Sequence, residues 1–118
     1  MSRTYVDYII DMLEAIDDAT EFTHGKDYKQ LEESKITYNA VLRCIQVLGQ
    51  AASRIPDSIK EAHSEIPWQR INSFRNKIVH DYDSLNSKII MDTIHLQLPE
   101  VKKKLEMLKT ELLKDETP

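Results

Sequence analysis

The sequence is poor in the residues that interrupt helices or cross-link a chain. It contains two glycines, four prolines and one cysteine in 118 residues. With so few helix breakers and turn formers, long stretches favour uninterrupted helix over hairpins. The single cysteine, Cys44, excludes an intrachain disulfide and fits a reducing compartment. The length and the 41% hydrophobic content suit one core and are too small for two ordinary domains, so we expect one all-α domain over residues 1–118.

The chain also lacks an excess of positive charge and any long apolar run. Its formal net charge is −4. Domains that coat nucleic acid are usually basic over a whole face, so any contact with RNA has to be local. No run of about 18 apolar residues is present to span a membrane, and no signal peptide begins the chain. We therefore expect a cytoplasmic protein without a membrane partner.

Apolar residues recur at spacings of three and four along several segments, as in amphipathic helices. The spacing predicts a helix over 3–23, stopped at His24-Gly25, and a second that begins as early as Asp27 and continues to Ile55. After it, we expect one or two short helical turns over 58–64. A further helix is expected from Trp68 to about Val79, with Pro67 at its first position. A last stripe from Ile90 to Leu112 contains Pro99, which must kink or split the helix. Long helices with short connections predict an up-and-down bundle of four to five helices.

Several residues that could carry chemistry are better explained as structural. Trp68 and Phe74 lie at core spacing in the third long helix, and Cys44 lacks a neighbour in sequence that would activate a thiol. The histidines His24, His63 and His95 show no metal-ligand spacing, so no metal site is expected. The run of lysines at 102–104 is explained by a solvated face paired with Glu100 and Glu106.

Four polar groups capable of chemistry lie close together at the end of the third long helix: Arg75, Asn76, His80 and Tyr82. Histidine can move protons near neutral pH, and arginine offers a permanent fork of donors to phosphate oxygens. These types permit metal-independent RNA cleavage. In one ideal helix, however, Arg75 and His80 are about 140° apart. A site between two copies of the helix, or fraying near Asp81, would bring them closer, whereas a solvated helix end is the plain alternative.

The order Arg, four residues, His, one residue, Tyr resembles the signature of the HEPN superfamily. The whole phrase IPWQRINSFRNKIVHDY, from Ile66 to Tyr82, is similar to the HepT-like toxin branch. The resemblance extends to the phrases YNAVLR at 38–43, LGQAASRI at 48–55 and LPEV at 98–101. Gln46 and Gln50 depart from it, because acidic residues are expected there in many relatives.

The resemblance implies a homodimeric, HEPN-like ribonuclease whose two motifs meet in a cleft. Arg75 and His80 would be catalytic, with Asn76 as the third polar member. The implied partner is a minimal nucleotidyltransferase antitoxin that uses ATP and Mg to transfer AMP onto Tyr82; the chain itself would need no cofactor. A bulky anion two residues from His80 would repel an RNA phosphate.

Further cations are candidates for contacts with RNA phosphates: Arg43, Arg54, Arg70 and Lys77. Two other functions remain open at this point. One is a non-catalytic helical subunit that positions substrate for a nucleotidyltransferase. The other is a structural dimer in which the motif serves only as an interface.

Overall fold

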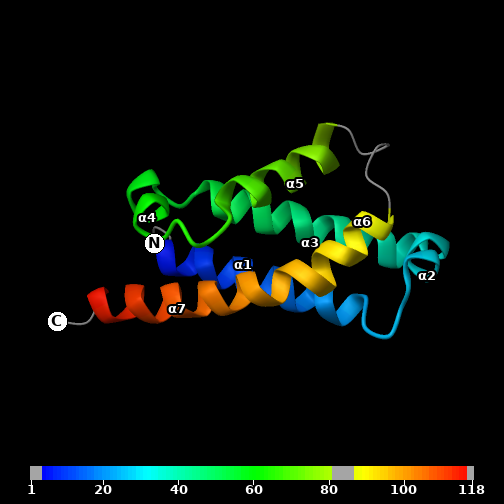
Figure 1. Ribbon diagram of the computed structural model, residues 1–118, viewed down its shortest axis with the longest axis horizontal. Helices are drawn as coiled ribbons and strands as arrows, with labels where there is room; N and C mark the ends of the chain where they lie inside the picture. Colours follow the sequence, from blue (N-terminus) through cyan, green and yellow to red (C-terminus); the bar gives the residue numbers. More distant parts are fainter. Residues whose placement is uncertain (1–3, 81–86, 117–118) are drawn as a thin grey trace.

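The structure is a computed structural model that describes residues 4–80 and 87–116. Every regular element in these ranges is helical, which confirms the all-α class, and the molecule measures 51 × 29 × 27 Å (Figure 1). The elements are α1 (Tyr5–Phe22), α2 (Tyr28–Glu33), α3 (Lys35–Ser53), α4 (Asp57–Ala62), α5 (Trp68–His80), α6 (Ser87–Asp92), the π-helical turn η2 (Thr93–Gln97) and α7 (Leu98–Glu116).

Helix α1 has the ends that its sequence predicts. Thr4 caps its start: the Asp7 N–H donates to Thr4 Oγ1, and the Thr4 N–H donates to the Asp7 carboxylate. Such reciprocal capping satisfies backbone donors that have no partner within the helix. Beyond the last turn, Gly25 has a φ of 70°, a conformation that glycine adopts without steric cost. The chain can therefore leave α1 at the predicted place.

The predicted single helix from Asp27 to Ile55 is wrong, because the structure divides it at Ser34. Ser34 has φ −104° and ψ 100°, which is extended backbone. Its hydroxyl accepts a hydrogen bond from the Thr37 N–H and so caps α3, while Asp27 caps α2 in the same way. Local side-chain bonds of this kind compete with helix continuation without any glycine or proline. The short α2 is thereby free to turn away from α3.

Pro99 divides the last helical segment, as predicted. The division is the π-helical turn η2 just before the proline, where the Leu98 N–H donates to the carbonyl of Thr93. In a regular helix the proline ring would clash with the carbonyl four residues earlier, that of His95. A wider turn before it relieves the clash, so α7 carries Pro99 in its first turn, where a missing N–H costs little.

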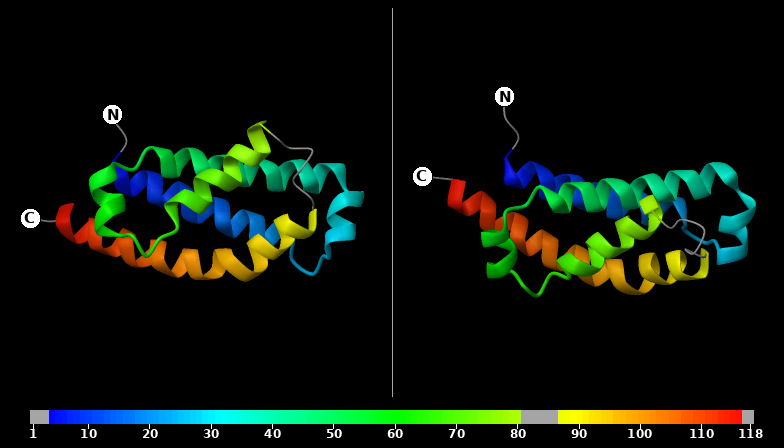
Figure 2. Two further views of the ribbon diagram at one scale, coloured as in Figure 1. Left: turned by 45° about the horizontal axis from the view of Figure 1, so that its top comes forward. Right: turned by 90° about the horizontal axis from the view of Figure 1, so that it is seen from above.

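The long helices pack side by side around one core. Helix α1 contacts α3 and α7, and α5 lies across α3 (Figures 1 and 2). The start of α1 and the end of α7 lie at one end of the bundle beside α4, and α2 contacts α6 at the other. The largest fully buried apolar side chains are Ile9, Met12, Ile16, Leu31, Val41, Ile66, Ile90, Ile94, Leu105 and Leu108. In the described ranges, no helix is both long and apolar enough to cross a membrane.

Trp68 and Phe74 are half-buried and pack against this core, which confirms their structural assignment. The indole N–H of Trp68 also donates to the carbonyl of His63 at 3.0 Å. That bond ties the first turn of α5 to the end of α4. The start of α5 is therefore anchored to its neighbours.

Candidate functional site

Helix α5 carries the candidate residues and packs its apolar side against α3. It begins at Trp68, and the Ile71 N–H donates to the carbonyl of Pro67 at 3.1 Å. Pro67 therefore precedes the helix by one residue instead of being its first member. Ile71 is buried, whereas Asn72 and Ser73 are exposed. The helix thus has one side fixed to the bundle and another open to a ligand or partner.

Arg75 is half-buried, with its stem against α3. The contact is unusually close because α3 has a glycine there. A Cβ built on Gly49 would lie 2.4 Å from Arg75 Cβ, 2.5 Å from Cδ and 2.7 Å from Cγ. The sequence interpretation assigned Gly49 no role, although a glycine inside a helix costs about 1 kcal/mol relative to alanine and can therefore mark a packing requirement.

Asn76 and Lys77 are exposed, so both can be reached from solvent. His80 is the last residue of α5, and the helix is continuous from Arg75 to His80. Five residues of helix rotate the backbone positions by about 140° around the axis. Asp81, Tyr82 and the side chain of His80 lie outside the described part of the chain, so the predicted approach of His80 to Arg75 or Tyr82 stays a prediction.

A groove of about 1090 Å³ borders the first half of α5. Its walls come from α3, α4, η2 and α7, and it extends on α5 as far as Asn72, one turn before Arg75. Arg70 lies in this groove. Arg43 and Arg54 are exposed on and just after α3.

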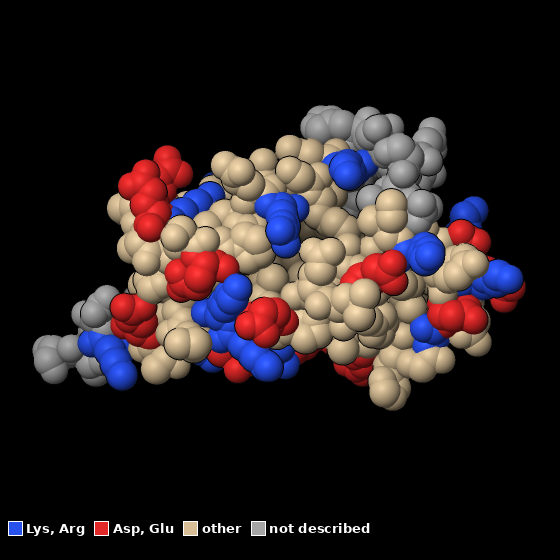
Figure 3. Space-filling model, in the orientation of Figure 1, with Lys and Arg blue, Asp and Glu red and all other residues tan. Residues whose placement is uncertain are grey.

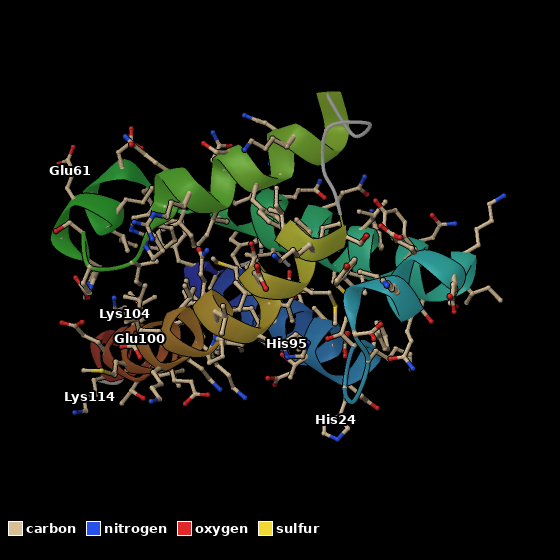
Figure 4. The ribbon with its side chains drawn as sticks, turned by 45° about the vertical axis from the view of Figure 1, so that its right-hand side comes forward. His24, Glu61, His95, Glu100, Lys104 and Lys114 are labelled. Carbon is tan, nitrogen blue, oxygen red and sulfur yellow. The ribbon has the colours of Figure 1, made fainter. Side chains whose placement is uncertain are left out.

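The charges in the groove are mixed. Four acidic residues (Asp57, Glu61, Glu65, Glu100) and three basic ones (Lys60, Arg70, Lys104) line it. Figure 4 labels Glu61 on α4 and Glu100 and Lys104 on α7, two elements that border the groove. Acidic and basic side chains are also interspersed over the face in Figure 3. A polyanion would gain little electrostatic attraction from such a mixture of charges.

The lysines of α7 have structural partners, only some of which were predicted. Lys102 Nζ lies 2.7 Å from Asp17 Oδ1 of α1 and 4.0 Å from Glu106 Oε1. The hydrogen bond and charge of Asp17 raise the pKa of Lys102. Lys104 donates to the carbonyl of Glu65 at 3.0 Å. The predicted pairing with Glu106 is therefore present, and the closer ion pair joins α7 to α1.

Cys44 is buried in the core, as predicted. Burial, with a smaller effect of Asp18, raises the pKa of its thiol to about 11. A thiol held in its neutral form is a poor nucleophile. Cys44 is therefore a packed side chain and not a reactive group.

The histidines whose side chains the structure describes lie apart. His63 contacts Glu65 at 3.4 Å and Glu111 at 3.1 Å, while His24 points away from the bundle and His95 lies on η2 (Figure 4). Within residues 4–80 and 87–116, no three His, Cys, Asp or Glu residues group as metal ligands would.

Gln46 and Gln50 differ in their surroundings. Gln46 is half-buried, and Gln50 is exposed at a second hollow of about 340 Å³. Tyr8 and Asp11 of α1 and Arg54 also line this hollow. An amide at position 50 adds no charge beside Asp11, where a carboxylate would place two like charges in one hollow.

Comparison with known proteins identifies the family. The model of the family described as ribonuclease HepT-like matches residues 12–108. A protein of Thermococcus cleftensis named as a probable ribonuclease HepT is 33% identical over 109 residues, covering 92% of this chain and 99% of the relative. A protein of Methanocaldococcus jannaschii provisionally named as an RNase, MJ1216, is 32% identical over 101 residues, covering 86% and 84%. No solved structure gives a significant match.

The all-α bundle and the family match place the chain in the class of HEPN proteins. The chain belongs to the HepT-like ribonuclease family of that superfamily.

Proposed function

We propose that this protein is the toxin endoribonuclease of a toxin–antitoxin pair and cleaves RNA without a metal ion. The observation that carries the proposal is the family match over residues 12–108, which includes the Arg-x4-His sequence of α5. The half-buried aliphatic stem of Arg75 supports the proposal. Packing of the stem against α3 restricts the positions that the guanidinium can take before substrate binds.

The proposed reaction is an attack of the RNA 2′-oxygen on the adjacent phosphorus. The bond from phosphorus to the 5′-oxygen breaks, leaving a 2′,3′-cyclic phosphate and a free 5′-hydroxyl. His80 moves the protons that the attacking oxygen loses and the leaving oxygen gains. Arg75 stabilises the negative charge that grows on the phosphate oxygens, and Asn76 orients the imidazole or donates to the phosphate.

The proposed active unit is a homodimer in which two copies of α5 meet. Within one helix, the backbone positions of Arg75 and His80 point in directions about 140° apart. Arg75 of one copy and His80 of the other therefore form a shared site more readily than the same two residues of one helix. The exposed Asn76 and Lys77 leave this side of α5 open for such an arrangement. Arg43, Arg70 and Lys77 are proposed as local contacts to RNA phosphates at its edges.

Purified protein is expected to cleave RNA in the presence of a metal chelator. The measurement is gel separation of end-labelled RNA, with mass spectrometry of the product ends to detect cyclic phosphate and 5′-hydroxyl groups. RNA that stays intact at every protein concentration would contradict the nuclease and favour a non-catalytic subunit of a nucleotidyltransferase complex. Cleavage that requires added metal would contradict the mechanism.

The proposed partner is a minimal nucleotidyltransferase antitoxin that uses ATP and Mg. The phenol oxygen of Tyr82 attacks the α-phosphorus of ATP, pyrophosphate leaves, and the tyrosine carries AMP. The added anion lies two residues from His80, where it would repel an RNA phosphate. A cytoplasmic location, with access to ATP and cellular RNA, is part of the same proposal.

Co-expression with such an enzyme is expected to raise the intact mass of the chain by whole AMP groups. Fragmentation should locate the addition at Tyr82, and the modified protein should no longer cleave RNA. Tyr82→Phe serves as the control, because it keeps the ring and lacks the acceptor oxygen. An unchanged mass in active co-expression, or AMP on another residue, would contradict this part of the proposal.

A further inference from the structure

Gly49 is a point of close approach between α5 and α3. It is buried, and the three carbons of the Arg75 stem all lie within 2.7 Å of the place where its Cβ would be. Ordinary carbon contacts begin at about 3.4 Å. The stem of Arg75 therefore occupies the volume that any other residue at position 49 would fill.

These three contacts are of two kinds, which differ in the movement that could relieve them. Cγ and Cδ of Arg75 could swing away by rotation of the side chain, which would carry the guanidinium elsewhere. Cβ is attached to the backbone, so its 2.4 Å contact could be relieved only by moving α5 relative to α3, by about 1 Å to reach ordinary contact. Both responses displace the guanidinium from its present position.

We propose that Gly49 is a positioning residue for the nuclease site: its missing side chain forms the seat for the stem of Arg75. The inference rests on the proposed function, since it concerns the group that stabilises charge on the RNA phosphate. Gly49 touches neither substrate nor reacting atoms and acts only through Arg75. A mid-helix glycine weakens α3, and the seat explains why one is present.

Gly49→Ala is expected to lower kcat for RNA cleavage by about 100-fold, because a misplacement of about 1 Å has that effect in active sites. KM should stay within about threefold, because Arg75 acts mainly on charge formed in the transition state. The matched control is Ser53→Ala, one turn further along α3. Ser53 is exposed and lines the groove of about 1090 Å³ that borders α5. This control should keep the kcat of the unaltered protein.

A second measurement separates the seat from a general packing role. With Arg75 present, Gly49→Ala should lower the midpoint of thermal unfolding. In an Arg75→Gly background the stem is gone, so the same change should raise the midpoint, because alanine favours helix over glycine. A general packing role would give a decrease in both backgrounds.

If Gly49→Ala does not fold, the unaltered protein still tests the seat. Nuclear Overhauser effects should join the Gly49 α-protons to the β-, γ- and δ-protons of Arg75. Their absence overturns the inference, as does full kcat in folded Gly49→Ala when Arg75→Ala shows its expected loss of kcat. If the unaltered protein cleaves no RNA, the proposed function fails, whereas the two unfolding midpoints still decide whether the seat exists.

Discussion

Arg75→Ala is expected to lower kcat for RNA cleavage by about 100- to 1000-fold, the usual effect of removing one donor that stabilises transition-state charge. The change keeps Cβ against α3 and removes the guanidinium, so the bundle should stay folded. Cleavage is measured in chelator at saturating RNA, and folding by circular dichroism. His80→Ala should cause a loss of similar size through proton transfer.

Two controls sharpen this result. Arg75→Lys keeps the stem and one positive charge but loses the planar fork, so its activity should fall between those of arginine and alanine. Lys103→Ala removes one exposed cation from α7 and should leave cleavage unchanged, which separates a site effect from a general loss of positive charge. Full activity in folded Arg75→Ala and His80→Ala would end the nuclease assignment to this motif.

Leu105→Ala is expected to be among the most destabilising single changes. Leu105 is 0% exposed in α7, where that helix packs on α1. Removal of a buried leucine side chain loses its transfer free energy and leaves a cavity, at a cost of about 3 kcal/mol. For a chain of this size the midpoint of thermal unfolding should fall by about 10 °C.

Met107→Ala is the matched control, because it shortens a large apolar side chain two residues away on the same helix. Met107 is 74% exposed, so little buried area is lost, and the midpoint should move by no more than about 2 °C. Equal effects of the two changes would show that α7 does not pack as described.

The hydrophobic pattern alone predicted much of the fold. The three- and four-residue spacing located α1, α5 and the helical stretch through α7, since burying one face of a helix requires that spacing. Pro99 marked the interruption of the last segment because its ring conflicts with any regular turn before it. The break at Ser34 escaped prediction, since a serine cap competes with the helix through a local hydrogen bond that many mid-helix serines do not make.

The candidate site, like the fold, was predicted only in part from the sequence. The sequence by itself determined the family and the chemical types at Arg75, Asn76 and His80, because these depend on which residues occur and at what spacing. Only the tertiary structure decided that Gly49 lies beneath the stem of Arg75. The two residues are far apart in the chain, and their contact depends on how closely two helices can approach, a distance that side-chain volume at the crossing determines.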